Sequence, residues 1–111
     1  MKKDTIQQII NKLVEFRDER DWAVFHKPKD LSLALSIESS ELLECFLWKK
    51  DEEANKGHIR EELADVFAYA FLLLHHYDWD LEDIMNAKIA LNAKKYPIST
   101  SKGNAKKYTD L

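Results

Sequence analysis

Apolar and polar positions alternate at helical spacing along most of this chain. The first apolar stripe repeats every three or four residues, and its members are Ile6, Ile9, Ile10, Leu13 and Phe16. Such spacing places apolar side chains on one face of an α-helix. The two prolines and two glycines, which punctuate helices, stand at positions 28, 57, 97 and 103. The pattern predicts helices over about residues 5–20, 31–48, 58–77 and 81–96.

Polar residues at the predicted helix starts support these boundaries. Thr5 and Gln8 have the spacing of a capping box, in which each side chain binds the other residue's backbone N–H. Asp30 and Asp80 precede the second and fourth helices, and aspartate is a preferred N-cap. The fourth helix is expected to end before Pro97, because the residue preceding a proline disfavours the helical conformation.

These elements predict an all-α protein, a four-helix bundle formed by a single domain over residues 1–111. The chain has only two glycines and two prolines, whereas an all-β fold needs more of both for its turns. Residues 98–111 are rich in lysine and serine, and we expect a basic, extended tail there. A chain this short buries a modest core, so we expect it to form a homo-oligomer.

Charge and composition exclude several classes of protein. The net charge of −3 gives no general attraction to nucleic acids or anionic lipids. The six lysines from Lys88 onward come without arginine and with little aromatic surface, unlike a nucleic-acid interface. The longest apolar run, residues 66–74, is too short to cross a membrane. Cys45 is the only cysteine and the first ten residues do not resemble a secretory leader, so we expect a cytoplasmic protein without nucleic-acid or membrane partners.

Two pairs of acidic residues lie on the two most apolar predicted helices. Glu38 and Glu41 are three residues apart, and so are Glu62 and Asp65. Residues at this spacing share one face of a helix. Asp65 is the only charge within residues 63–74, so we expect a central, buried helix whose carboxylate needs a partner.

If these two helices pack together, four carboxylates meet in one cluster. Such a cluster repels itself unless protons or cations neutralise it. Oxygen ligands favour hard cations, which predicts Mg²⁺, with Mn²⁺ as the alternative. The chain has no Glu-x-x-His pair, which argues against a di-iron bundle. Ordinary solvated acids remain the other interpretation, because a single Glu-x-x-Glu is common on helix surfaces.

The acidic pattern is Glu38-x-x-Glu41 followed, after twenty residues, by Glu62-x-x-Asp65. It resembles the signature of the all-α nucleoside triphosphate pyrophosphohydrolases, the MazG-like superfamily. Six further stretches resemble the dCTP pyrophosphatase branch; they are residues 20–28, 33–35, 46–49, 61–66, 95–97 and 107–109. The resemblance covers the chain from about Phe16 onward.

The resemblance implies a nucleotide diphosphatase that uses Mg²⁺ to convert a nucleoside triphosphate and water to the monophosphate and pyrophosphate. It implies dCTP or a modified dCTP as substrate, a role in clearing the nucleotide pool, and assembly as a dimer or tetramer. The implied metal ligands are Glu38, Glu41, Glu62 and Asp65. The implied substrate-binding residues are Trp22, His26, Trp48, Tyr69, Asn92, Lys95 and Tyr96.

The chemistry needs a group that accepts the proton of the attacking water. A carboxylate not saturated by metal can do so, and we expect Glu38, or else Glu41, in this catalytic role. Lys95 is a candidate for neutralising the departing pyrophosphate, because an ammonium group binds phosphate as a point charge. A helix C-terminus alone also favours a lysine at this position.

Two alternative functions remain open at this level. In the first, the chain is a non-catalytic helical module that binds nucleotides or a partner chain, and the acids serve specificity or solubility. In the second, the chain belongs to the same superfamily but acts on dUTP or another nucleotide, such as phosphoribosyl-ATP. The loop from Trp22 to Pro28, which resembles the dCTP pyrophosphatase branch, argues against the second alternative.

Overall fold

Helices are the regular secondary structure of residues 2–111, the part of the chain that this computed structural model describes, and no strand occurs among them. Four long helices are α1 (Ile6–Asp18), α2 (Pro28–Glu44), α3 (Lys56–Tyr77) and α4 (Leu81–Lys95). A short helix α5 (Ile98–Ser101) and three 3₁₀ turns, η1 (Ala23–Phe25), η2 (Asp51–Glu53) and η3 (Tyr108–Asp110), complete the chain. The all-α prediction is confirmed.

The chain divides into two compact units, of which the first ends at Asp78 and the second is Trp79–Leu111. The first unit holds α1, α2 and α3, and the second holds α4 and α5. The predicted single domain and the packing of α4 into a four-helix bundle therefore stay predictions. No helix in residues 2–111 combines the length and apolarity needed to span a bilayer.

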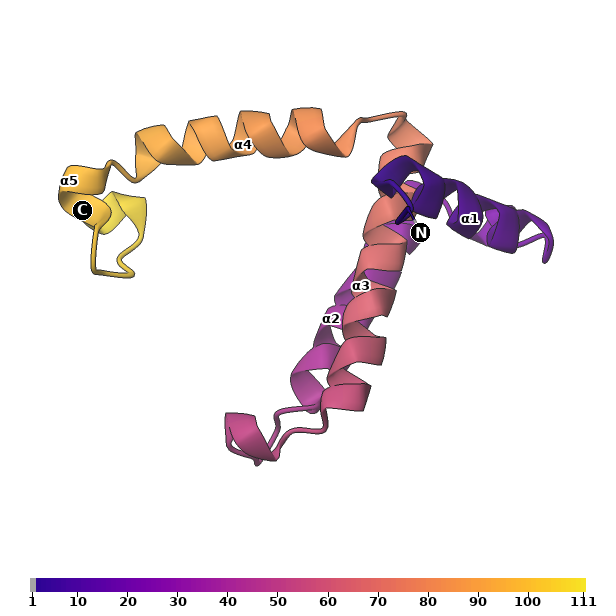
Figure 1. The fold of residues 1–111 in the computed structure, drawn as a ribbon, viewed down its shortest axis with the longest axis horizontal. Helices are drawn as coiled ribbons and strands as arrows, with labels where there is room; N and C mark the ends of the chain where they lie inside the picture. Colours follow the sequence, from indigo (N-terminus) through magenta and orange to yellow (C-terminus); the bar gives the residue numbers. More distant parts are fainter. Residues whose placement is uncertain (1) are drawn as a thin grey trace. The chain divides into compact units, whose positions relative to one another are not determined.

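In the first unit, α2 and α3 lie side by side as a hairpin, and α1 packs against α3 (Figure 1). The most buried side chains come from all three helices; they are Ile10 of α1, Leu31 of α2, and Phe71, Leu72 and Leu74 of α3. Full burial of one such side chain stabilises a fold by about 1.5–3 kcal/mol. The core therefore sits where the start of α2 meets the C-terminal half of α3, and the opposite half of the hairpin is left for the acidic residues.

Helix α2 begins earlier than the sequence pattern predicts. Pro28 occupies the first helical position, where its missing N–H is not needed and its fixed φ suits the helix. Asp30 lies in the first turn instead of capping it, so the predicted N-cap is wrong. Its negative charge still favours the helix N-terminus through the macrodipole.

Helix α3 is less buried than the sequence predicts. Phe67 is 50% exposed, and Leu63 and Asp65 are exposed as well. The expectation of a helix buried all round is therefore wrong for its N-terminal half within one chain, because the packing of α1 and α2 against α3 leaves this face exposed. Exposed apolar residues also lie on α2, at Leu33 and Ile37.

The second unit begins with the predicted cap, since the Asp80 side chain accepts a hydrogen bond from the Asp83 N–H at 3.1 Å. The tail that we expected to be extended contains α5 and η3. Its Tyr108 ring lies edge-on to Tyr96, at 6.0 Å between ring centroids, and 4.8 Å from the Lys95 ammonium. These contacts, worth about 0.5–1.5 kcal/mol each, fold the tail back onto the end of α4.

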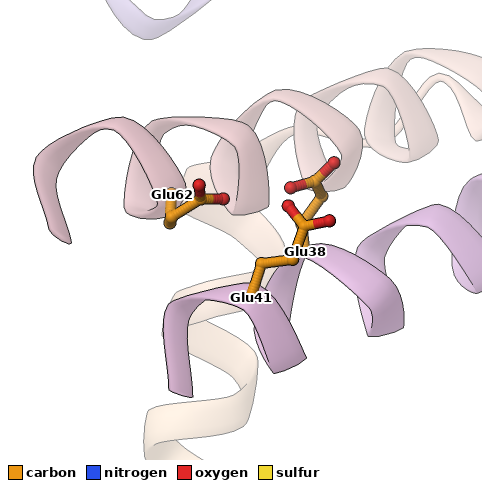
Figure 2. Close-up of side chains that lie close together, drawn as sticks. All are labelled: Glu38, Glu41 and Glu62. Carbon is orange, nitrogen blue, oxygen red and sulfur yellow. The ribbon is translucent and has the colours of Figure 1, made fainter. Parts of the chain in front are cut away.

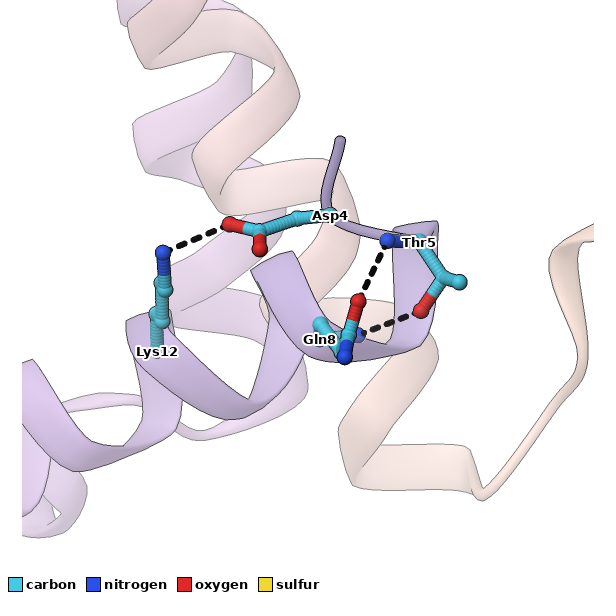
Figure 3. A network of polar contacts seen from close by, with 4 residues as sticks. All are labelled: Asp4, Thr5, Gln8 and Lys12. Atoms are coloured by element: carbon cyan, nitrogen blue, oxygen red, sulfur yellow. Dashed lines mark hydrogen bonds and ion pairs between the residues drawn. The ribbon is translucent and has the colours of Figure 1, made fainter. Parts of the chain in front are cut away.

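The capping box at the start of α1 offers a test of local stability (Figure 3). The Thr5 hydroxyl accepts from the Gln8 N–H at 3.1 Å, and the Gln8 side chain accepts from the Thr5 N–H at 2.7 Å. We expect Thr5→Ala to lower the free energy of unfolding by about 1 kcal/mol in urea titrations. Thr5→Ser keeps the acceptor oxygen and is the matched control. Equal stability of the two variants would show that the cap contributes nothing.

Candidate metal centre and adjoining pocket

Three carboxylates face one another between α2 and α3 (Figure 2). Glu38 and Glu41 come from α2, one turn apart, and Glu62 comes from α3. One carboxylate oxygen from each residue lies within 4.8 Å of the others. Because the two helices run side by side, residues three apart on one helix can meet a residue of the other at the same level. We call these three residues the carboxylate triad.

The triad is electrostatically strained without a counter-charge. One oxygen each of Glu38 and Glu62, Oε2, is buried without a hydrogen-bond partner in the described part of the chain. Burial, a hydrogen bond with Glu41 and the charges of Glu41, Asp65 and Glu62 raise the pKa of Glu38 to about 7. Burial and the same neighbours also raise the pKa of Glu62. At neutral pH this cluster binds either a proton or a cation.

The donor set fits a hard divalent cation. Carboxylate oxygens are the preferred ligands of Mg²⁺ and Mn²⁺, and the two unpaired oxygens gain a partner when an ion binds. Asp65 lies one turn beyond Glu62 on α3, is exposed, and is not part of the triad. Its charge nevertheless acts on Glu38 and Glu62. The structure thus brings three of the four predicted metal ligands together and places the fourth nearby, while their role as ligands stays a prediction.

A pocket of about 350 Å³ lies near the triad, because Asp65, one turn from Glu62 on α3, is among its lining residues. Its walls are mostly apolar or aromatic, with few polar groups, as is typical of small-molecule sites. The lining residues are Leu13, Phe16, Arg17, Trp22, His26, Asp65, Ala68, Tyr69 and Leu72. The structure therefore brings the predicted residues Trp22, His26 and Tyr69 into one pocket beside the acids.

The loop after α1 positions the aromatic side of this pocket. The Trp22 N–H donates to the Arg17 carbonyl at 3.1 Å, and Asp21 turns the chain with a left-handed φ of 53°. The Trp22 ring then lies edge-on to Phe16, at 5.8 Å between centroids. His26 lies edge-on to Tyr69 at 6.2 Å.

Burial and charge also tune the polar groups of the pocket. Burial and then the Arg17 charge lower the pKa of His26, against a smaller opposing effect of Asp30, so the imidazole is neutral at pH 7. Burial and then the charges of Glu38, Asp65 and Glu41 raise the pKa of Tyr69, which keeps its hydroxyl protonated. The pocket thus offers neutral hydrogen-bonding groups beside a strongly acidic edge.

One predicted substrate-binding residue of the first unit, Trp48, does not line this pocket. Trp48 is 99% exposed and has a left-handed φ of 62°, just after α2 ends. Asn92, Lys95 and Tyr96 belong to the second unit, and their place in the site stays a prediction.

The sequence interpretation also missed Arg17, which lines the pocket. A signal was present, because Arg17 continues the apolar stripe of α1 four residues after Leu13.

Metal binding by the triad predicts a pH dependence with a definite sign. An ion needs ionised Glu38, and a carboxyl with a pKa of about 7 is mostly protonated at pH 6 and mostly ionised at pH 8. We expect Mg²⁺ or Mn²⁺ affinity, measured by calorimetry, to rise roughly tenfold from pH 6 to pH 8, with proton release. Glu61→Gln, an exposed neighbour on α3, should bind normally, and Glu38→Gln should not. Equal affinity at both pH values would contradict the triad as the binding site.

Comparisons with known proteins agree with the helical arrangement. A model of the MazG-like family matches residues 33–111. The chain is 39% identical to the dCTP pyrophosphatase 1 of Bos taurus and 36% identical to that of Homo sapiens, over 96% of its own length and 68% of theirs. The crystal structure of a pyrophosphatase from Archaeoglobus fulgidus superimposes with a TM-score of 0.79 at 36% identity, covering 87% of this chain and 96% of that one. The predicted resemblance is confirmed, and the chain belongs to the MazG-like family.

Proposed function

We propose that this chain is a Mg²⁺-dependent nucleoside triphosphate pyrophosphohydrolase that converts a dNTP and water to the dNMP and pyrophosphate, with dCTP or a modified dCTP as substrate. The observation that carries this proposal is the carboxylate triad near a pocket with aromatic walls, whose lining includes Asp65. Relatives that are named dCTP pyrophosphatase 1 support the reaction class and the base.

In this function, Glu38, Glu41 and Glu62, with Asp65, would hold the metal. A Mg²⁺ ion held by these residues would supply positive charge for the triphosphate oxygens and would lower the pKa of the attacking water. Glu38 is the favoured proton acceptor for the attacking water, because a carboxylate that the metal does not saturate can take that proton. Glu41 is the second choice, since neighbouring carboxylates share their protons.

The aromatic pocket would receive the base and sugar. Its volume of about 350 Å³ lies near the small end of ligand pockets, which favours a pyrimidine nucleoside. Trp22 and Tyr69 offer ring faces or edges, and base–aromatic stacking contributes about 1–3 kcal/mol per base. Because Asp65 lines this pocket and lies one turn from Glu62, a nucleotide bound here would have its α-phosphate near a metal held by the acids.

The remaining predicted residues would complete the site. Trp48 offers a fully exposed ring, while Asn92, Lys95 and Tyr96 lie near the end of α4. A lysine or asparagine there suits the sugar or the phosphates.

A homo-oligomer, a dimer or tetramer, is part of the proposal. The α2–α3 hairpin leaves several apolar residues uncovered, and an open hollow on α3 is lined by Ile59, Leu63, Ala64 and Phe67 together with Lys56 and Arg60. Exposed apolar surface of this kind is stabilised by burial against another chain.

Pyrophosphate release tests the proposed reaction directly. With Mg²⁺ we expect release from dCTP or 5-substituted dCTPs to exceed release from the other dNTPs and dUTP, and EDTA to abolish it. Glu62→Gln should lower kcat/KM by at least roughly 100-fold, because it removes a metal ligand. Glu61→Gln, the exposed neighbour, should remain active. If no pyrophosphate is released from any of these nucleotides, the proposal is overturned and a non-catalytic binding module is favoured.

Light scattering on a size-exclusion column tests the assembly. We expect a mass of two or four chains for the unmodified protein. Phe67→Lys places a charge in the uncovered apolar face, so it should shift the protein toward the monomer. Glu52→Lys, in the exposed η2 turn, is the charge control and should leave the mass unchanged. A monomeric unmodified protein would contradict the expected oligomer.

A further inference from the structure

Arg17 is an unusual cation for helix α1. Its side chain is only 16% exposed, whereas that of Lys12 on the same helix is 70% exposed. It lines the aromatic pocket next to Trp22 and His26. A mostly buried arginine side chain at the wall of a pocket can offer its remaining donors to a ligand with acceptors.

The Asp18 carboxylate binds one edge of this guanidinium. Arg17 Nε donates to Asp18 Oδ1 at 2.9 Å, and Arg17 Nη2 lies 2.9 Å from the same oxygen. Within residues 2–111, Nη1 has no hydrogen-bond partner. Arginine carries five N–H donors in a planar fork, so the outer edge keeps parallel donors available. The Asp18 contact also restricts the side chain in advance, which lowers the entropy lost on binding a ligand.

His26 supplies a second group without a partner in the same pocket. Its Nδ1 atom is buried and has no hydrogen-bond partner in the described part of the chain. Because the ring is neutral at pH 7, this nitrogen can accept a hydrogen bond when Nε2 carries the proton. Arg17 and His26 therefore contribute unused donors and an unused acceptor to the lining of one pocket with aromatic walls.

Cytosine matches this set of groups. Its pairing edge has two adjacent acceptors, N3 and O2, followed by the N4 amino donor. Thymine and uracil carry a hydrogen on N3 and an acceptor at position 4. Their N3–H would face a donor of Arg17, and their O4 would face the acceptor of His26. A site that leaves such groups unpaired rejects the wrong base strongly.

We propose that Arg17 is the specificity-determining residue of the pocket: its outer edge donates to N3 and O2 of cytosine while His26 Nδ1 accepts from the N4 amino group. This inference rests on the proposed function only for the hydrolysis of the bound nucleotide. The recognition of cytosine by Arg17 and His26 does not depend on that reaction. Asp18 acts as a positioning residue for the guanidinium.

Binding of dCMP and dTMP to the full chain, followed by tryptophan fluorescence, tests the recognition without any turnover. We expect the unmodified protein to prefer dCMP and Arg17→Met to lose this preference by roughly 5- to 150-fold, the discrimination of one good bidentate contact. Arg17→Lys keeps the charge but not the fork, so it should recover little. Lys12→Met removes a charge from the same helix outside the pocket and should keep the preference.

The same variants are then assayed for kcat/KM on dCTP and dTTP. If the unmodified enzyme prefers dCTP and both Arg17 variants keep that preference, the inference is overturned while the proposed function stands. If no triphosphate is hydrolysed but dCMP binding still depends on Arg17, the proposed function fails and the inference holds. Equal binding of dCMP and dTMP by the unmodified protein overturns the inference. Thermal melts identify folded variants, and Arg17→Lys decides the question if Arg17→Met does not fold.

Discussion

Mutual repulsion among the carboxylates between α2 and α3 is the constraint on which the rest of this structure depends. Carboxylate oxygens of Glu38, Glu41 and Glu62 approach within 4.8 Å of one another, and burial together with these neighbouring acids raises the pKa of Glu38 to about 7. The folded protein therefore binds this proton more tightly than the unfolded chain, in which the group titrates near its ordinary value of 4.5. By linkage, Glu38 lowers stability progressively as the pH rises from about 4.5 to about 7, unless a cation replaces the proton. A fold that tolerates this arrangement has its stabilising contacts elsewhere.

Those contacts lie at the other half of the hairpin. Leu31 and the C-terminal half of α3, around Leu72, form the core together with Ile10 of α1. Apolar burial there holds α2 and α3 side by side, and the helices then carry the acidic residues into proximity. One half of the hairpin is apolar and the other half is acidic. Because of this division, a short chain can hold both a core and a charged site. It also leaves apolar surface, such as Phe67, without a partner in the single chain.

The pocket separates two kinds of charge. Asp65 and the carboxylate triad lie at one edge, and the Arg17 guanidinium lies among the aromatic residues. A cation at the triad would attract phosphates, whereas a planar fork of donors suits the edge of a base. The neutral state of His26 follows from the same arrangement, because burial and Arg17 both disfavour its charged form. Each electrostatic property of the site thus arises from its neighbours along α1, α2 and α3.

Local patterns in the sequence determined the helices, the capping box at Thr5, the cap at Asp80 and the three-residue spacing of the acids, because helical periodicity and capping depend on neighbours a few residues away. Family motifs added which acids and aromatics to examine. Only the tertiary structure decided that three acids meet while Asp65 stays exposed, that Trp48 lies outside the pocket, and that Arg17 lines it. The physical reason is that these relations depend on how one helix is rotated against another, and that rotation is set by long-range burial around residues such as Leu31 and Phe71.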